Sequence, residues 1–131
     1  MTLFVDASAA VSILALEPDH MTFVAQMQRD PVRIWSAVAR WETFRALCRA
    51  DNITVVDAEL RVADFEAENK IRLVPIAERE AQLAFSAHAN FGRNNHPASL
   101  NMGDCFAYAC AKANDARLLY KGDDFSKTDL A

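Results

Sequence analysis

The chain has 131 residues, of which 52% are apolar and 24% charged, with three glycines and four prolines. A chain of this length and composition can bury one core, so we expect a single domain over residues 1–131 and no disordered tail. The net charge of -4 excludes proteins that hold nucleic acid through bulk positive charge, so any polyanion has to be contacted locally.

The cysteines and the first apolar segment indicate in which cellular compartment the protein is expected. Cys48, Cys105 and Cys110 are odd in number and lack the CxxC spacing, which favours reduced thiols and a cytoplasmic protein. The apolar stretch at 7–16 follows Asp6 instead of a basic region and has about half the length of a membrane span. We therefore expect neither a targeting segment nor a membrane anchor.

Short apolar segments alternate with helix-forming segments along the chain. Ser36 is a good N-cap for the third helix, and Thr54-x-x-Asp57 resembles a capping box before the fourth. In the segment 77–89, helical spacing places Ala81, Ala84, Phe85 and His88 on one face. The strand candidates are 3–5, 32–35, 71–76 and 117–120, the helix candidates are 7–16, 18–30, 37–50, 54–69, 77–89 and 103–113, and the long loop is 90–101.

This alternation predicts an α/β fold, a three-layer α/β/α sandwich around a mostly parallel sheet of four to five strands. In such folds ligands bind beyond the carboxyl ends of the strands. Acidic residues stand at those ends: Asp6 directly after the first strand, and Asp123 and Asp124 after the last. We expect them to share one edge of the sheet.

Two further carboxylates belong to helices that begin near the same edge. Asp104 lies in the first turn of the last helix, and Glu42 lies beside Trp41 in the third helix. Taken alone, Asp6 is an ordinary helix N-cap, Asp104 complements a helix dipole and Glu42 is a solvated helix residue. Taken together, carboxylates that converge repel one another, and a hard divalent cation resolves this conflict.

Mg²⁺, or Mn²⁺ in its place, is the cation that oxygen ligands of this kind favour. Zinc is disfavoured because His20, His88 and His96 are scattered and the cysteines lack zinc-type spacing. Magnesium at such a site activates water and neutralises charge on a phosphodiester.

Four segments carry a resemblance to a known family, and it covers nearly the whole chain in order and length. The segments are Val5-Asp6-Ala7-Ser8-Ala9, Trp41-Glu42, the stretch from Asn101-Met102-Gly103-Asp104 to Tyr108-Ala109, and Lys121-Gly122-Asp123-Asp124-Phe125. They resemble PIN-domain ribonucleases and, more closely, the VapC toxins of bacterial toxin-antitoxin pairs. The resemblance implies a Mg²⁺-dependent endoribonuclease that acts on RNA and is held inactive by a cognate VapB-type antitoxin.

The resemblance also implies roles for single residues. Asp6 matches the first metal-binding aspartate of the family, Asp104 the aspartate that shares its metal, and Glu42 the acidic residue of the third helix. The fourth acidic position is Asp123 or Asp124, with Asp123 favoured.

Residues next to Asp6 complete the comparison with the family pattern. Ser8 matches a hydroxyl position behind Asp6, where it orients the carboxylate or a water on the metal. The family's common threonine after the first aspartate is Ala7 here, so one hydrogen bond behind the site is missing.

Basic and aromatic residues near these acids have two interpretations each. Arg93, His96, Lys112 and Lys121 contact RNA phosphates or are ordinary surface charge, and a role of His96 as general base is the weaker hypothesis. The rings of Phe91 and Tyr108 stack on bases or, more simply, pack in the core. The apolar helices between residues 9 and 47 exceed what one small core needs, which favours a partner surface and a homodimer.

Three rival functions use similar residues. A phosphoacceptor signalling domain needs paired acids after the first strand and an aspartate after a middle strand, and neither is present. A phosphatase with a DxD nucleophile is disfavoured because Asp6-Ala7-Ser8 lacks the second aspartate. An RNA-binding module without nuclease activity stays open, since intact acids do not prove catalysis.

Overall fold

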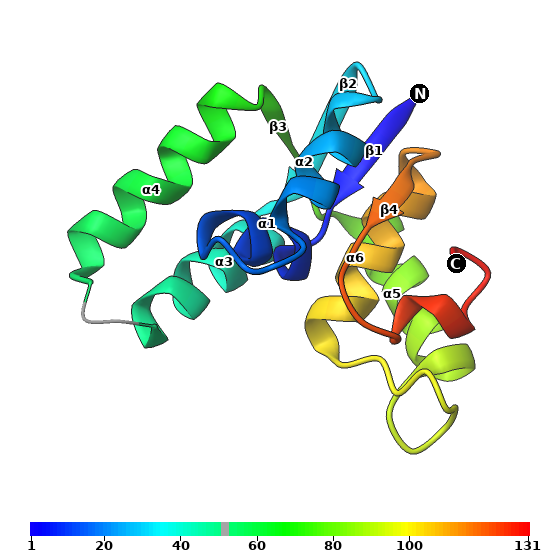
Figure 1. The fold of residues 1–131 in the computed structure, drawn as a ribbon. Helices are drawn as coiled ribbons and strands as arrows, with labels where there is room; N and C mark the ends of the chain where they lie inside the picture. The colour runs from blue at the N-terminus through cyan, green and yellow to red at the C-terminus, as the bar shows by residue number, and fades with distance from the viewer. Residues whose placement is uncertain (51–52) are drawn as a thin grey trace.

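The computed structural model describes residues 1–50 and 53–131, and it consists of short strands that alternate with helices (Figure 1). The strands are β1 (Thr2–Val5), β2 (Val32–Ser36), β3 (Ile71–Val74) and β4 (Arg117–Leu119). The α-helices are α1 (Ala7–Leu14), α2 (His20–Gln28), α3 (Ala37–Arg49), α4 (Val55–Glu68), α5 (Glu78–Phe91) and α6 (Met102–Ala113), and a 3₁₀ turn η1 (Phe125–Lys127) follows β4.

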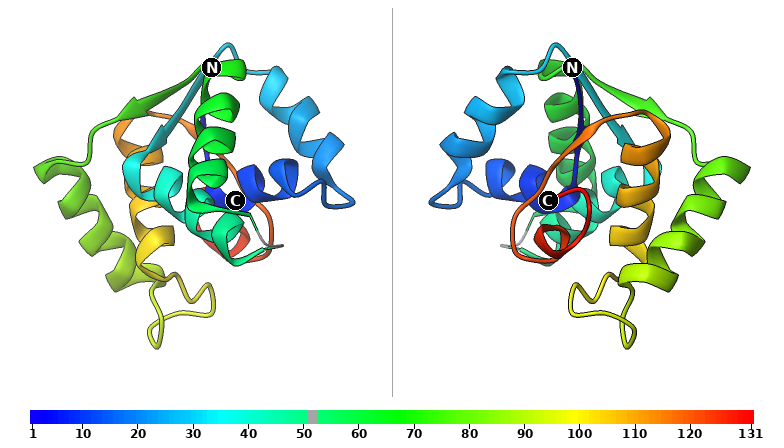
Figure 2. Two further views of the ribbon diagram at one scale, coloured as in Figure 1. Left: turned by 90° about the vertical axis from the view of Figure 1, so that its left-hand side faces the viewer. Right: turned by 90° about the vertical axis from the view of Figure 1, so that its right-hand side faces the viewer.

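The four strands form one parallel sheet in the order β3-β2-β1-β4. Figure 2 shows α5 and α6 on one side of the strands and α1 and α2 on the other, and α4 lies along α3. The predicted three-layer α/β/α sandwich with a parallel sheet of four to five strands is thereby confirmed. Because all strands are parallel, their carboxyl ends meet at one edge, as expected for the site.

Side-chain caps explain where several helices begin. Ser36 Oγ accepts a hydrogen bond from the Ala39 amide at 3.2 Å, and Thr54 Oγ1 accepts one from the Asp57 amide at 3.1 Å. Both N-caps agree with the prediction, because Ser and Thr satisfy amides that the first helical turn leaves free.

The sheet and the helices on both faces bury the largest apolar side chains. Phe4, Ile34 and Trp35 are fully buried. Trp35 donates from Nε1 to Glu66 Oε2 at 2.7 Å and packs against the Phe65 ring, with the centroids 5.8 Å apart. The indole therefore ties α4 to β2 with its polar edge satisfied.

The predicted face of α5 is wrong by one position. The buried residues of this helix are Glu80, Ala84 and Ala87, whereas Phe85 is 65% exposed. Glu80 Oε1 accepts from the Ala77 amide at 2.8 Å, so a capping contact turns a charged residue inward. This rotation leaves Phe85 on the surface.

Two smaller expectations concern thiols and membranes. Cys48, Cys105 and Cys110 are free cysteines, of which Cys105 and Cys110 are buried. Within residues 1–50 and 53–131 no helix has the length and apolarity needed to cross a bilayer.

Candidate active site

Asp6 links the end of β1 to the start of α1. Its amide donates to the Leu119 carbonyl at 3.0 Å, which extends the pairing of β1 with β4 by one residue. Its side chain is the N-cap of α1, with Oδ2 accepting from the Ser8 amide at 3.1 Å and from Ser8 Oγ at 2.6 Å. Asp6 is only 5% exposed. Capping and a buried carboxylate at the sheet edge are thus properties of the same residue.

Asp104 is fixed at the first turn of α6 by reciprocal bonds with Asn101. Asn101 Oδ1 accepts from the Asp104 amide at 2.9 Å, and Asp104 Oδ2 accepts from the Asn101 amide at 3.1 Å. One carboxylate oxygen of Asp104 is held by the backbone in this arrangement. The other oxygen is left for the site.

Glu42 reaches the same place from α3 because residue 103 has no side chain. A Cβ built on Gly103 would lie 2.1 Å from Glu42 Oε2 and 2.6 Å from its carboxyl carbon, Cδ. The first turn of α6 therefore accommodates the Glu42 carboxylate only with glycine at this position.

Of the two aspartates that follow β4, Asp124 is the one whose side chain acts on the other carboxylates. Its charge acts on both Asp6 and Asp104 and raises the pKa of each. Asp123 instead contributes its carbonyl, which accepts from the Ser126 amide and hydroxyl. The placement does not support the preference for Asp123 over its neighbour.

Burial, with a smaller effect of neighbouring negative charges, raises the pKa of Asp6, Glu42 and Asp104. Burial raises the pKa of Glu42 to about 7, and the charges of Asp6 and Asp104 add to the effect. Burial likewise raises the pKa of Asp104 to about 7, with contributions from Asp6 and Asp124 against the lowering bond from Asn101. The pKa of Asp6 is also raised, mainly by burial, although its bonds from Ser8 oppose this. We define the acidic cluster as Asp6, Glu42 and Asp104 together with Asp124, whose charge acts on Asp6 and Asp104.

The acidic cluster has no cation of its own in the part of the chain that the structure describes. None of the ion pairs formed there involves one of its four members. Equally, no three His, Cys, Asp or Glu side chains in those residues have the spacing of a finished metal site. The donor chemistry nevertheless fits a hard divalent cation, because all four side chains offer carboxylate oxygens and their shared repulsion needs a positive charge.

The sequence profile of the PIN domain matches residues 3–130, almost the whole chain. This chain belongs to the PIN domain family. Its relatives include ribonuclease VapC30 of Mycobacterium tuberculosis, 33% identical over 135 residues covering 98% of this chain and 96% of the relative. A VapC ribonuclease of Rhizobium meliloti is 37% identical over 139 residues, covering 97% of this chain and 98% of the relative. The predicted resemblance to VapC-type PIN domains is confirmed.

A solved structure agrees with the PIN fold. Toxin VapC20 of Mycobacterium tuberculosis, described as a sarcin-ricin loop cleaving toxin, superposes with a TM-score of 0.74 over 95% of this chain and 92% of its own. At 18% sequence identity this likeness shows the fold alone.

The basic residues expected around the acidic cluster of this PIN domain have other partners in most cases. Lys112 pairs with Asp129 at 2.6 Å, and Lys121 pairs with Glu17 and Asp19. Arg93 is exposed in the loop between α5 and α6.

His96 and the two aromatic rings of that region pack within the protein. His96 Nδ1 accepts from the Ala98 amide at 3.0 Å, and its ring meets Phe91 edge-on with the centroids 5.2 Å apart. Tyr108 is 7% exposed and donates to Asp129 at 2.7 Å. The arrangement agrees with core packing for Phe91 and Tyr108 and with a loop-shaping role for His96.

Two residues that arrange the site, Asn101 and Gly103, were not predicted to do so. Asn101 carries a readable signal, since Asn three residues before Asp at a helix start is the spacing of a capping pair. Gly103 carries only a weak one: glycine lowers helix stability, so its presence in a first turn indicates a close approach. What approaches it, Glu42, is distant in sequence and requires the fold.

Proposed function

We propose that this PIN-domain chain is an endoribonuclease that depends on Mg²⁺ or Mn²⁺ held by Asp6, Glu42, Asp104 and Asp124. Ribonucleases of the VapC type depend in general on a divalent metal, and RNA is their substrate. The observation that carries the proposal is the acidic cluster itself. Burial and neighbouring negative charge raise the pKa of Asp6, Glu42 and Asp104, and none of the four carboxylates has a cationic partner among the described residues.

The four side chains have unequal tasks in this proposal. Asp6 and Asp104 would be the primary ligands, while Glu42 and Asp124 would hold outer waters or a second ion. When bound, the metal supplies activation of water and neutralises the charge that develops on the phosphodiester.

The protein's own contribution is to fix these oxygens before any ion arrives. Ser8 orients Asp6 Oδ2 through two hydrogen bonds, and these bonds oppose the rise in the pKa of Asp6. The backbone amide of Asn101 orients one oxygen of Asp104 in the same way, by donating a hydrogen bond to Oδ2. Preorganised ligands cost less rearrangement when charge develops in the transition state.

The proposed substrate is RNA with exposed bases in loops or single-stranded regions, cleaved to 5′-phosphate and 3′-hydroxyl ends. Bases in such regions are accessible for recognition, whereas the deep major groove of duplex RNA is not. Arg93 is the remaining candidate for a phosphate contact, since it is exposed and lies in the loop that precedes α6.

The direct test is cleavage of a mixed RNA pool by the purified chain with Mg²⁺, with Mn²⁺ and with EDTA, followed by mapping of the new ends. The Asp6→Asn and Asp104→Asn variants should lose at least about 100-fold in rate, because each removes a ligand charge. Asp115→Asn is the matched control: Asp115 is exposed and lies at φ 50°, a backbone conformation that asparagine also tolerates.

Two outcomes would contradict the proposed metal-dependent ribonuclease activity. Cleavage that persists in EDTA, or in both aspartate variants, would overturn the metal mechanism. A folded chain that binds Mn²⁺ and RNA but cuts no RNA in the pool would favour the rival function, an RNA-binding module.

A VapB-type antitoxin is the partner that VapC toxins have in general, and we propose a groove for it here. A groove of about 580 Å³ runs between α3 and α4 and is mostly apolar. Trp41, 58% exposed, lines it and directly precedes Glu42 in α3. An apolar helix in this groove would pack against α3, the helix that carries Glu42, and a basic side chain that extends from it would supply positive charge to the acidic cluster.

Inhibition of RNA cleavage by an antitoxin tests the proposed groove. A VapB-type antitoxin encoded beside the chain should inhibit cleavage, and Trp41→Ala should weaken its binding at least tenfold while cleavage of RNA persists. Equal binding to both forms would move the antitoxin away from this groove.

We also propose a homodimer, supported by a second apolar groove of about 380 Å³ between α5 and α6. Phe85 and Met102 line it and are 65% and 68% exposed. Light scattering after size exclusion should give twice the monomer mass, and Phe85→Glu should give the monomer mass. A wild-type chain that is monomeric at high concentration would contradict the dimer.

A further inference from the structure

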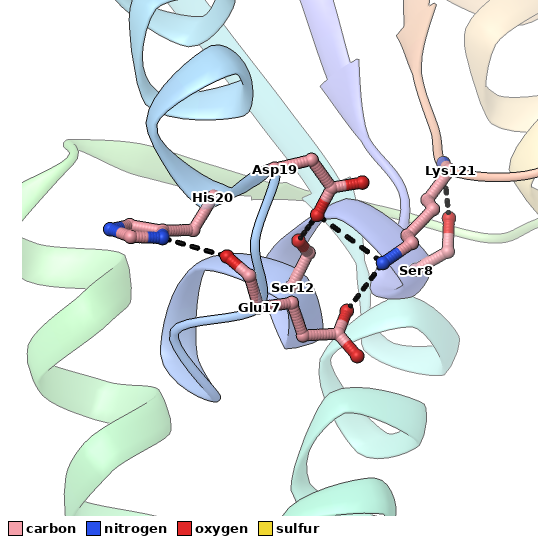
Figure 3. A network of polar contacts seen from close by, with 6 residues as sticks. All are labelled: Ser8, Ser12, Glu17, Asp19, His20 and Lys121. Carbon is pink, nitrogen blue, oxygen red and sulfur yellow. Dashed lines mark hydrogen bonds and ion pairs between the residues drawn. The ribbon is translucent and has the colours of Figure 1, made fainter.

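The ammonium of Lys121 lies between the carboxylates of Glu17 and Asp19 (Figure 3). Its ammonium donates to Glu17 Oε1 at 3.0 Å and to Asp19 Oδ1 at 3.2 Å. The same oxygen of Asp19 accepts from Ser12 Oγ at 2.6 Å, and Ser12 is completely buried. The carboxylate that receives the lysine is therefore held from the interior of the protein.

The backbone of Lys121 is tied to the acidic cluster itself. Its amide donates to Ser8 Oγ at 2.9 Å, and Ser8 Oγ donates to Asp6 Oδ2 at 2.6 Å. A single hydroxyl therefore accepts from Lys121 and donates to Asp6. Any shift of the backbone at residue 121 would be passed to Asp6 through this hydroxyl.

The segment that follows Lys121 carries Asp124. Gly122 has φ +98°, a conformation that other residues rarely adopt, so the chain turns sharply here. Phe125 is 2% exposed and its ring meets Tyr120 edge-on with the centroids 5.2 Å apart. With Phe125 and Tyr120 fixed by packing, Lys121 is the anchor at the start of the turn that presents Asp124.

We propose that Lys121 is a positioning residue, which Glu17 and Asp19 hold so that the turn from 121 to 124 places Asp124 and Ser8 for the acidic cluster. This role rests on the proposed function, since it concerns the same metal site. It replaces the expectation that Lys121 contacts RNA phosphates.

The observed contacts favour positioning over a phosphate contact. Both partners of the ammonium are carboxylates of this chain, and the bond to Glu17 raises the pKa of Lys121, with Asp19 adding to the rise. An isolated exposed ion pair contributes little to stability. The ammonium of Lys121, however, is shared between two carboxylates, one of which is ordered by Ser12. A lysine engaged in this way has to leave both partners before it meets a phosphate.

The experiment compares three variants with the wild-type chain: Lys121→Met, the double variant Glu17→Gln with Asp19→Asn, and Lys121→Arg. Lys127→Met is the matched control, because Lys127 is an exposed lysine of the adjacent turn. Three quantities are measured for each: Mn²⁺ affinity of the RNA-free chain by calorimetry, kcat and KM for a cleaved RNA, and thermal unfolding.

Positioning predicts the same result for Lys121→Met and for the double variant. Each should bind Mn²⁺ about tenfold more weakly and lower kcat about 10- to 100-fold with KM for RNA unchanged, as outer partners of metal sites do. Lys121→Arg should restore most of both quantities because it keeps a charge for Glu17 and Asp19. Lys127→Met should match the wild type.

The double variant distinguishes positioning from phosphate binding, because the two roles predict different changes in Mn²⁺ affinity and in KM for RNA. If Lys121 bound phosphate, freeing it from Glu17 and Asp19 would lower KM for RNA and leave Mn²⁺ affinity unchanged, which would overturn the proposal. A folded Lys121→Met that binds Mn²⁺ as the wild type does would also overturn it. A wild-type chain that binds no Mn²⁺ would instead overturn the proposed function, and the role of Lys121 with it.

Discussion

Gly103 and Glu42 are in direct contact: a Cβ on residue 103 would lie 2.1 Å from Glu42 Oε2. The group that would have to move is the flexible end of a side chain, so Gly103→Ala should fold normally. Alanine in the first turn of a helix should even add up to about 1 kcal/mol of stability. Glu42 would be displaced, and RNA cleavage should fall about 10- to 100-fold while the melting temperature stays level or rises.

A double-mutant cycle checks that this loss passes through Glu42. Glu42→Ala alone should lower activity by a similar factor, and adding Gly103→Ala to it should cost little more, because residues in contact are not additive. Full additivity of the two losses would assign the effect of Gly103 to something other than Glu42.

The neighbouring aspartates after β4 should differ strongly. The charge of Asp124 acts on Asp104, whereas Asp123 is engaged through its carbonyl, which every residue type has. Asp124→Asn should lower kcat about 100-fold, and Asp123→Asn should change it less than about threefold. Rates measured at equal Mg²⁺ concentration decide the matter, and the reverse order would restore the preference for Asp123.

The raised pKa values of Glu42 and Asp104 predict a pH-dependent stability of the metal-free chain. The folded protein binds protons at these groups up to about pH 7, whereas the unfolded chain releases them near their ordinary values. Stability from this source is complete below about pH 4 and is lost as the pH rises through about 7. After allowance for solvent screening the loss should be roughly 1–3 kcal/mol, a few degrees in melting temperature.

Two comparisons test the origin of that loss. Asp104→Asn should raise the melting temperature of the metal-free chain at pH 8, because it removes one of the mutually repelling charges. Mg²⁺ at pH 8 should stabilise the wild type and have little effect on the variant. A variant that melts lower than the wild type at pH 8 would contradict the electrostatic account.

The prediction of the fold succeeded where a local signal decided the structure. Ser36 and Thr54 cap their helices through bonds that span three residues, and such spacings are visible in the chain. The inward face of α5 was missed, because the contact of Glu80 with the Ala77 amide outweighs the apolar spacing that includes Phe85.

In the site, too, contacts between residues close in sequence were predicted, whereas contacts between distant residues were not. The bond from Ser8 to Asp6 spans two residues and was expected, and the resemblance to the PIN domain placed Asp104. The partners of Lys121 lie 104 and 102 residues away, so no spacing could show that its charge is occupied. Likewise, two adjacent aspartates look equal in a sequence, and only the folded chain shows that the charge of Asp124 acts on Asp104.

Asn101 offers a last prediction, in which stability and catalysis separate. Its side chain caps α6 by accepting from the Asp104 amide, whereas the bond to the Asp104 carboxylate comes from its backbone and survives substitution. Asn101→Ala should therefore lower the free energy of unfolding by about 1 kcal/mol, and Asn101→Ser should recover most of it. Cleavage should fall less than about fivefold in either variant at a temperature where both are folded. If a folded Asn101→Ala instead lost 100-fold in kcat, the side-chain amide of Asn101 would have to act on the metal or the RNA directly.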